Sequence, residues 1–595
     1  MSPTAAPTDR DLASIAEARA LARRAKDAWL QLAEFDQARV DAIVAAMADA
    51  AAAHAEPFAR LAVEETGFGV VADKIQKNLF AAKKVYEFIR PMKTVGVIAR
   101  HEDRRVVEIA EPFGVVAAIV PSTNPTSTAI YKILIAIKAR CAIVLSPHPA
   151  AVKCITRVAE VLDEAARRAG APPGAISWMT EVTLEGTQEL MKHRDVAVIL
   201  ATGGMGLVRA AYSAGKPAYG VGPGNAPAFI ERTADVKKAV RDVITGKTFD
   251  NGVLCSSENS VVVDEPIAEA VKREFVTQGG YFLSATEMDA VAKALVTPQR
   301  LPNPALVGKS AAFIAERCGI SVPEGTRVLI APLEGVGRDY PLSIEKLCPV
   351  LAFYVVRDWR EGCERCKQIL RYGGMGHTMS IHSRDERVIL EFGLKKPAFR
   401  IVVNTPTTHG SIGLTTGLDP AMTLGCGGYG GNITSDNISP RHLLNIKRLA
   451  YEVSPAVVED AGAAVRSPSG SRQADPRLPS PPARPPEPTG IDAGTLSRRI
   501  EAFLDARGFR AGQPSVDAHS ARRPVASSPA QPVQPVLDFV CEDDVRRAIR
   551  AGTTLLISER TIVTPAARDL AEAHRILQVA PWAAPPSTPT TASRE

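Results

Sequence analysis

The spacing of hydrophobic and polar positions changes twice along the first half of the chain. Residues 9–90 carry apolar residues at helical spacing with almost no Gly or Pro, which predicts packed helices. Residues 95–111 hold two strand-like runs, VGVIAR and RRVVEIAEP, on either side of a charged turn. From residue 114 onward, short continuous apolar runs alternate with helical stretches. Such runs are typical of parallel strands covered on both faces, so the sequence predicts βαβ units and a doubly wound α/β sheet.

The turns that follow these apolar runs are candidate ligand-binding positions, because doubly wound sheets bind ligands beyond the carboxyl ends of their strands. They are residues 121–125 (PSTNP), 146–149 (SPHP) and 201–204 (ATGG). The last turn opens a helix, where backbone N–H groups can bind a phosphate; it lacks full GxGxxG spacing, and a simple glycine turn is the alternative. Residues 219–225 (YGVGPGN) form a second glycine-rich loop that allows close backbone approach to a ligand.

Cys255 is the candidate for a covalent nucleophile. It follows turn-forming residues, Asp250, Asn251 and Gly252, and precedes an apolar run at residues 261–263. This order places the thiol on a short connection before a strand, where its sulfur can project into a cleft. The alternative is a small buried hydrophobic residue, since free cysteines usually pack rather than react.

Composition narrows the class of protein. The net charge of +6 is spread along the chain, and aromatic residues make up only 5% of it. We therefore expect no nucleic-acid-binding surface. Nine cysteines at irregular spacing indicate a reducing compartment, and the lone Cys363–Cys366 pair predicts no metal site. The first residues contain no apolar signal segment, and the Ala-rich residues 40–55 are too short to cross a bilayer, so we expect a cytoplasmic location and no membrane partner.

Six segments between residues 10 and 452 together resemble the aldehyde dehydrogenase superfamily. The chain looks most like its coenzyme-A-acylating branch, especially the aldehyde dehydrogenase half of bifunctional aldehyde-alcohol dehydrogenases. Nothing in the chain resembles the iron-dependent alcohol dehydrogenase half. The matching segments are VPSTNPTSTAIYKILIAIKARCAIVLSPHP, ATGGMGLVRAAYSAGKPAYGVGPGNAPAFI, KTFDNGVLCSSENSVVV, EKLCPVLAFYVV, GGMGHTMSIHS and MTLGCGGYGGN.

The resemblance implies a Rossmann-like, doubly wound NAD-binding domain over residues 1–225, with a β oligomerisation arm near residues 95–110. Residues 226–414 would form an α/β catalytic domain that carries Cys255. Residues 415–453 would return to the NAD-binding and oligomerisation region, and we expect a basic helix at residues 440–451.

The resemblance also implies roles for individual residues. Cys255 would attack the aldehyde, while the Asn124 amide and the Cys255 backbone N–H would stabilise the oxyanion. Glu345 would hold the nicotinamide ribose, and His377 would act near the thiol or the coenzyme. Without the resemblance, Asn124 reads as a turn former, Glu345 as a solvated helix charge and His377 as a structural turn residue. The remaining predicted cofactor-binding residues are Ser146, Pro147 and Pro149 beside the adenosine ribose, Thr202, Gly203 and Gly204 near the pyrophosphate, and Pro121, Gly220 and Val221.

Two departures from the family pattern carry information. Hydrolytic members have a glutamate that activates water where this chain has Gly220, and the loop of residues 219–225 has no other carboxylate. A thiol needs less help from a base than water does, and glycine leaves room for a bulky acceptor, so we expect the acyl group to pass to coenzyme A through a pocket without a carboxylate able to activate water. Ser146 stands where many members have a lysine, which favours NAD over NADP.

The tail is a different kind of sequence. Residues 454–535 are rich in Pro and Ser and predict a disordered linker. Within it, residues 495–508 predict a short amphipathic helix with one stripe of Leu496, Ile500, Phe503 and Leu504. It resembles the encapsulation peptides of bacterial microcompartment enzymes; a helix that folds back on its own catalytic body is the alternative. Residues 536–580 read strand, helix, strand, helix, a small α/β module similar to one in proteins of microcompartment operons, for which assembly or docking is a hypothesis.

These observations predict NAD-dependent oxidation of a short aldehyde, such as acetaldehyde or propionaldehyde, to its acyl-coenzyme A through a Cys255 thioester. We expect a homo-oligomer, a dimer or larger, in the bacterial cytoplasm, inside the lumen of a microcompartment whose shell proteins would bind residues 495–508. Two alternatives stay open: oxidation to the free acid, and a non-enzymatic assembly protein. The sequence does not fix which aldehyde is used.

Overall fold

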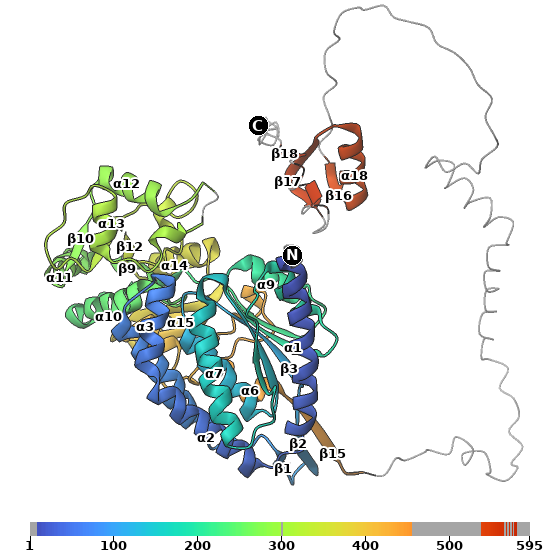
Figure 1. Ribbon diagram of the computed structural model, residues 1–595. Helices are drawn as coiled ribbons and strands as arrows, with labels where there is room; N and C mark the ends of the chain where they lie inside the picture. Colours follow the sequence, from blue (N-terminus) through green and yellow to red (C-terminus); the bar gives the residue numbers. More distant parts are fainter. Residues whose placement is uncertain are drawn as a thin grey trace, which may run out of the picture. The chain divides into compact units, whose positions relative to one another are not determined.

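The computed structural model describes residues 9–298, 301–454 and 537–563, together with residues 567, 570, 571, 574 and 576–579. The chain divides into two units, Met1–Ala461 and Gly462–Glu595, which are described separately (Figure 1). Over this part of the chain, no helix is both long and apolar enough to cross a membrane.

The first unit begins with the predicted helices. They are α1 (Arg10–Leu32), α2 (Gln37–Ala53), α3 (Ala55–Thr66), α4 (Val71–Leu79) and α5 (Val85–Ile89), with a π-helical turn between the last two. Asp9 and Asp36 accept hydrogen bonds from the first turns of α1 and α2, which satisfies backbone N–H groups that have no partner within the helix.

A five-stranded parallel sheet follows, in the order β5-β4-β3-β6-β7. Its helices lie on both faces, as the alternation of strands and helices predicts, and every residue of its central strand is buried. The strands are β3 (Val115–Val120), β4 (Ala142–Pro147), β5 (Ile176–Trp178), β6 (Val196–Thr202) and β7 (Ala218–Val221), and the helices are α6 (Pro125–Lys138), α7 (Val152–Arg168), α8 (Leu184–Lys192) and α9 (Met205–Tyr212).

A second parallel sheet has seven strands, in the order β10-β11-β12-β9-β8-β13-β14. It begins at Ala226 and is also covered by helices (Figure 1). The strands are β8 (Ala226–Ile230), β9 (Glu258–Asp264), β10 (Gly280–Phe282), β11 (Val328–Pro332), β12 (Val350–Val356), β13 (Gly376–His382) and β14 (Ala398–Val403). The helices are α10 (Val236–Thr248), α11 (Ala268–Thr277), α12 (Ala285–Leu295), α13 (Ala311–Arg317), α14 (Trp359–Tyr372), α15 (Glu386–Leu394) and α16 (Thr407–Ser411).

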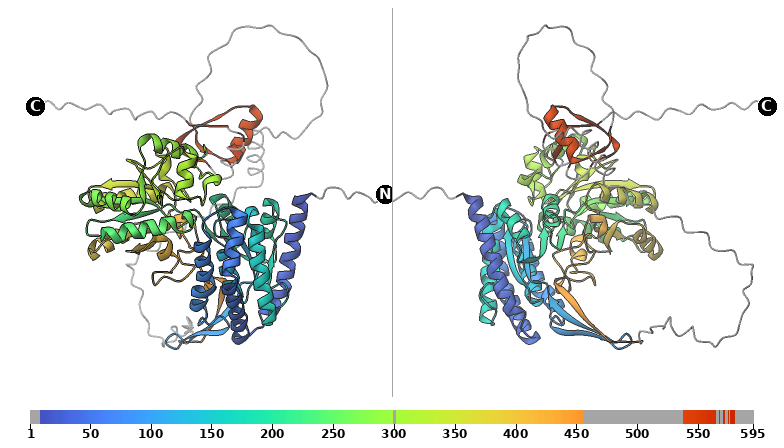
Figure 2. Two further views of the ribbon diagram at one scale, coloured as in Figure 1. Left: turned by 60° about the vertical axis from the view of Figure 1, so that its left-hand side comes forward. Right: turned by 90° about the vertical axis from the view of Figure 1, so that its right-hand side faces the viewer.

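A small antiparallel sheet extends from this body (Figure 2). It joins β1 (Gly96–His101), β2 (Val106–Pro112) and β15 (Leu444–Ala450). The basic helix predicted at residues 440–451 was wrong: a short 3-10 turn, Pro440–Leu443, leads directly into β15. Seven residues of β15 pair with β2, so long-range strand pairing overrides the local helical reading.

The second unit contains a parallel sheet in the order β16-β17-β18. Its elements are β16 (Leu537–Val540), α18 (Glu542–Ala551), β17 (Leu555–Val563) and β18 (Leu577–Val579). Val540, Val545, Ala567 and Ala571 form its small core. The strand–helix–strand order is as predicted, and β18 was not foreseen. The predicted helix at residues 495–508, and almost all of the predicted linker, lie outside the described residues.

Candidate active site

The two large sheets present opposite edges to one another. The loop of residues 222–225 runs from the carboxyl end of β7 to the amino end of β8, so the carboxyl edge of the five-stranded sheet faces the amino edge of the seven-stranded sheet. A cavity of about 480 Å³ lies between these edges. It is lined by the predicted residues Pro121, Asn124, Ser146, Pro147, Pro149, Thr202, Gly203, Gly204, Val221, Cys255 and Glu345.

One end of this cavity is bordered by the start of helix α9. Gly204, which lines the cavity, is the N-cap of α9, and the backbone N–H groups of that helix's first turn have no partner within the helix. The Thr202 hydroxyl beside it is buried without a hydrogen-bond partner. Among the described residues that line the cavity, none is a lysine or arginine. The Ser146 hydroxyl contacts the Thr187 hydroxyl at 2.8 Å, so this wall is polar but uncharged.

Gly220 does not line the cavity, unlike the other cofactor-binding candidates. A Cβ at this position would come within 2.8 Å of Val208 Cγ1 and about 3.1 Å of the Tyr212 ring. The expectation that glycine here opens space for a bulky acceptor is therefore wrong: the missing side chain leaves room for helix α9, not for a ligand.

A strained turn presents the Cys255 thiol. Helix α10 ends at Thr248, and the next residues include Asp250 and Asn251 at positive φ, 51° and 54°. Cys255 lies three residues before β9 and is partly exposed at the cavity wall. Gly224 packs against it so closely that a Cβ would lie 2.1 Å from the Cys255 carbonyl oxygen.

His377 is the nearest base to this thiol. It is the second residue of β13, it is buried, and its Nε2 lies 3.2 Å from Cys255 Sγ. Its Nδ1 lies 3.0 Å from the Thr378 hydroxyl, which can accept the Nδ1 proton and leave Nε2 free to accept one. Burial lowers the pKa of His377 to about 3, with the Arg400 guanidinium adding to the effect, so the imidazole is neutral.

Burial has the opposite effect on the nucleophile. Burial, together with smaller contributions from Glu345 and Cys426, raises the pKa of the Cys255 thiol to about 12, while Arg400 acts to lower it. Cys255 is therefore a protonated thiol at neutral pH, and its activation requires a group that takes its proton in the reaction.

Glu345 brings a carboxyl group into the same cavity. Its Oε1 accepts a hydrogen bond of 3.0 Å from the Gly224 N–H. Burial raises the pKa of Glu345 to about 8, against the effects of that N–H and of Lys247 and Lys346. The loop of residues 219–225 lacks a carboxylate, but Glu345, which was predicted to hold the nicotinamide ribose, brings a carboxyl group to the cavity from a different loop.

Asn124 reaches the cavity from the N-terminus of α6. It occupies the N-cap position but makes no side-chain capping bond. Instead its Oδ1 accepts a 2.6 Å hydrogen bond from Lys77 Nζ, and its Nδ2 donates to the Thr123 hydroxyl at 3.2 Å. Lys77 and Lys74 both pair with the buried Asp250.

These lysines and a second group of lining residues were not predicted from the sequence. Two lysines three positions apart on an otherwise ordinary helix, α4, were the available signal for buried charge. Val182, Thr183, Leu184 and Thr187 also line the cavity. They lie around the start of α8, where Thr183 caps the helix, and nothing in their spacing marks them as binding residues.

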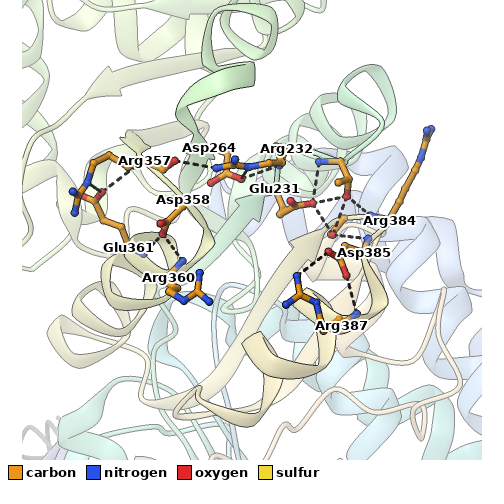
Figure 3. Close-up of polar contacts among 12 residues, drawn as sticks. Glu231, Arg232, Asp264, Arg357, Asp358, Arg360, Glu361, Arg384, Asp385 and Arg387 are labelled. Atoms are coloured by element: carbon orange, nitrogen blue, oxygen red, sulfur yellow. Dashed lines mark hydrogen bonds and ion pairs between the residues drawn. The ribbon is translucent and has the colours of Figure 1, made fainter.

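The carboxyl edge of the seven-stranded sheet has a different character. Five arginines and five carboxylates gather at the ends of its strands and at the helix starts that follow (Figure 3). Asp264 accepts hydrogen bonds from the backbone N–H and Nε of Arg232, both at 3.0 Å. Asp358 and Asp385 accept from the first turns of α14 and α15. The charges at this edge are thus used in pairing and in helix caps.

Comparison with known proteins places the chain among aldehyde dehydrogenases. The family model described as "Aldehyde dehydrogenase family" matches residues 3–282. The bifunctional aldehyde-alcohol dehydrogenase AdhE of Escherichia coli K12 is 44% identical over 442 residues, 73% of this chain and 50% of that protein. The chain thus spans about half the length of the curated relatives it matches first.

Two solved structures share the fold over most of their length. An acetylating aldehyde dehydrogenase from Geobacillus thermoglucosidasius is 52% identical with a TM-score of 0.75, covering 76% of this chain and 99% of its own. A propionaldehyde dehydrogenase from the fucose utilisation microcompartment of Clostridium phytofermentans is 29% identical with a TM-score of 0.67, covering 74% and 98%.

Proposed function

Because the chain belongs to the aldehyde dehydrogenase family, we propose that it oxidises a short aldehyde with NAD and passes the acyl group from Cys255 to coenzyme A. The observation that carries this proposal is the contact of 3.2 Å between Cys255 Sγ and the neutral His377 Nε2 at the cavity wall. The pKa values of about 12 and about 3 keep the proton on the sulfur before attack, so Nε2 is placed to accept that proton as the sulfur bonds to the aldehyde carbon.

The chain's own residues supply most of the reaction. His377 Nε2 accepts the thiol proton as Cys255 Sγ bonds to the aldehyde carbon, which gives a hemithioacetal oxyanion. The Asn124 amide and the Cys255 backbone N–H would donate to that oxyanion. Bound NAD would supply the hydride acceptor, and loss of the hydride from this carbon would leave a thioester on Cys255. Thr202, Gly203, Gly204 and Glu345 are the residues that would hold NAD.

Transfer to a thiol suits this site better than hydrolysis. Water needs a base, and the carboxyl that lines the cavity, Glu345, has a pKa of about 8 and is mostly neutral at pH 7. The thiol of coenzyme A loses its proton far more readily than water does. Once His377 has released the Cys255 proton to solvent, its Nε2 can accept the coenzyme A proton and return it to the departing Cys255 sulfur. The word "acetylating" in the name of the Geobacillus relative supports the same choice.

A substrate panel tests the proposal. With acetaldehyde or propionaldehyde, NADH and the acyl thioester should form together, and omission of coenzyme A should reduce steady turnover at least tenfold. Turnover at the full rate without coenzyme A would favour oxidation to the free acid. Absence of turnover under all conditions would favour the assembly protein.

For the nicotinamide cofactor, we propose NAD over NADP, because the cavity wall formed by the described residues offers no lysine or arginine to a 2′-phosphate. The ratio of kcat/KM with the two cofactors measures this preference. A ratio near one, or in favour of NADP, would contradict it.

We also propose a homo-oligomer. Strand β14 is an edge strand of its sheet and exposes Phe399 and Val403, and the β1–β2–β15 sheet exposes Val97 and Leu449. Exposed apolar strands at sheet edges favour pairing with another chain. Sedimentation analysis should give a dimer or larger species, and a monomer at micromolar concentration would refute the proposal.

The location inside a microcompartment is proposed from the sequence of residues 495–508 and from the microcompartment origin of the Clostridium relative. Deletion of these residues should abolish co-sedimentation with shells and leave turnover in solution intact. Unchanged co-sedimentation would refute the targeting role and leave the catalytic proposal standing.

A further inference from the structure

A buried lysine lies directly behind the amide that would stabilise the oxyanion. Lys77 projects from α4 with 2% of its surface exposed, and its Nζ is 2.6 Å from Asn124 Oδ1. Asparagine at an N-cap normally accepts a hydrogen bond from the first turn of its helix. Asn124 does not, so its side chain is held by the lysine instead of by α6.

This contact determines which end of the amide faces the cavity. An ammonium group only donates hydrogen bonds, so it must meet the amide oxygen and cannot meet the amide nitrogen. Nδ2 is thereby turned the other way. One of its two protons is directed to the Thr123 hydroxyl at 3.2 Å, and the second remains for a ligand oxygen. With the amide reversed, Oδ1 would face the oxyanion and repel it.

The positive charge of Lys77 is balanced locally. Asp250, fully buried, pairs with Lys77 and, at 2.9 Å, with Lys74. The Asp250 backbone N–H in turn donates to Asp73 at 2.7 Å. Two lysines therefore face two aspartates, which leaves little net charge to act on the oxyanion from a distance. What the cluster provides is position: Asp250 lies in the turn that leads to Cys255, so one ion cluster ties the nucleophile's turn to the amide.

We propose that Lys77 is a positioning residue, which fixes the Asn124 amide with its N–H groups toward the oxyanion. Through Asp250, it also keeps that amide at a fixed position relative to Cys255. The inference rests on the proposed function, since it assigns Lys77 a role in that reaction. Lys74 offers a matched control. It lies on the same helix, is equally buried and pairs with the same aspartate, but its other contact is the Thr123 carbonyl at 3.3 Å and not the amide.

The test compares Lys77→Met with Lys74→Met in the full chain. Lys77→Met should lower kcat for NADH formation about 10- to 100-fold, below the 10²–10³-fold typical of losing a whole oxyanion donor, while the aldehyde KM changes less than about threefold. Lys74→Met should lower the thermal midpoint by a similar amount and keep kcat within about threefold. Lys77→Arg retains donor and charge and should be faster than Lys77→Met.

A double-mutant cycle separates positioning from general damage. If Lys77 acts through Asn124, Lys77→Met in an Asn124→Ala background should cost less than about threefold further. Equal losses of kcat in Lys77→Met and Lys74→Met, or additive losses in the cycle, would overturn the inference while the wild type remains active. If Lys77→Met does not fold, Lys77→Arg in the same cycle decides the question. A wild type without turnover would instead overturn the proposed function, and this inference with it.

Discussion

The two large sheets of the first unit are both parallel, yet the residues at their carboxyl edges differ: one edge is small and uncharged, the other is charged and paired. At the edge of the five-stranded sheet, the strand ends and the turns that follow them are rich in Pro, Ser, Thr and Gly, and they border a cavity whose described lining contains no lysine or arginine. At the edge of the seven-stranded sheet, Asp264 ends β9, and Glu231 and Arg357 directly follow β8 and β12. Asp264 pairs with Arg232, Arg357 pairs with Glu361, and Glu231 accepts a hydrogen bond from Ser383 (Figure 3). The rule that ligands bind at carboxyl edges would select both.

The difference shows that side chains, and not topology, decide which edge is available. Carboxylates that cap α14 and α15, or pair with arginines, already accept hydrogen bonds from the protein itself. Small uncharged residues leave backbone N–H groups and space for a ligand. The seven-stranded sheet contributes to the site by its amino edge instead, through Cys255, Glu345 and His377. Each of the following experiments perturbs one side of this comparison.

The largest effect is expected at the amino edge of the seven-stranded sheet. Cys255→Ala removes the atom that would carry the acyl group, so NADH formation should fall by on the order of 10³-fold or more. Cys318, another partly exposed cysteine, is the control, and Cys318→Ala should stay within about twofold. Steady-state rates measure both. Activity retained in Cys255→Ala would exclude the thioester mechanism.

The second-largest loss of kcat is expected from a substitution in the loop that joins the two sheet edges. Gly224→Ala places a Cβ 2.1 Å from the Cys255 carbonyl oxygen, so the cysteine turn must shift. Displacement of a reacting group by about 1 Å can cost on the order of 10²-fold in rate. Gly417→Ala, where no atom lies within 4 Å of the added Cβ, should have no such effect. Equal kcat for the two variants would show that the turn adapts freely.

The pH dependence of the alkylation rate tests the raised pKa values of Cys255 and Glu345. Because the pKa of Cys255 is raised to about 12, its thiolate fraction should rise about tenfold per pH unit from pH 7 and show no plateau by pH 10. Glu345, with a pKa raised to about 8, becomes charged above that pH and holds the thiol's pKa up. Glu345→Gln should therefore alkylate several-fold faster at pH 9 and little faster at pH 7.

Iodoacetamide labelling of Cys255, followed by mass spectrometry of its peptide, gives these rates. Cys255→Ala identifies the background from the other cysteines. A plateau near pH 8 in the wild type would mean that the thiol's pKa is not raised. Cys255 would then not need His377 as a base.

Much of this arrangement could be predicted from the sequence, and the omissions have a common cause. Continuous apolar runs and turn residues are local signals, so the doubly wound sheets and the turns of Asn124, Thr202 and Cys255 were predictable. Partners supplied by distant segments were not: Lys77 behind Asn124, or α9 against Gly220. Strand β15 shows the same limit, since its local pattern reads as a helix and its pairing with β2 decides otherwise.

The smallest effect on activity is expected at the closed carboxyl edge. Asp264 ends β9, whose first residue, Glu258, lies three residues after Cys255; the two ends of this strand are about 20 Å apart at 3.3 Å per residue. It is fully buried and accepts both hydrogen bonds from Arg232, while its Oδ1 has no partner. Asp264→Ala leaves these donors unpaired and should lower the free energy of unfolding by about 1–3 kcal/mol, with kcat within about twofold.

Urea unfolding and turnover, measured on the same preparation, separate the two quantities. Arg387→Ala at the same edge removes an exposed ion pair of 3.7 Å with Asp385 and should change stability by less than about 0.5 kcal/mol. A tenfold loss of kcat in folded Asp264→Ala would show that this edge also serves the reaction. If kcat is unchanged while stability falls, the ion pairs at this edge maintain the sheet, and the chemistry depends on the opposite ends of the same strands.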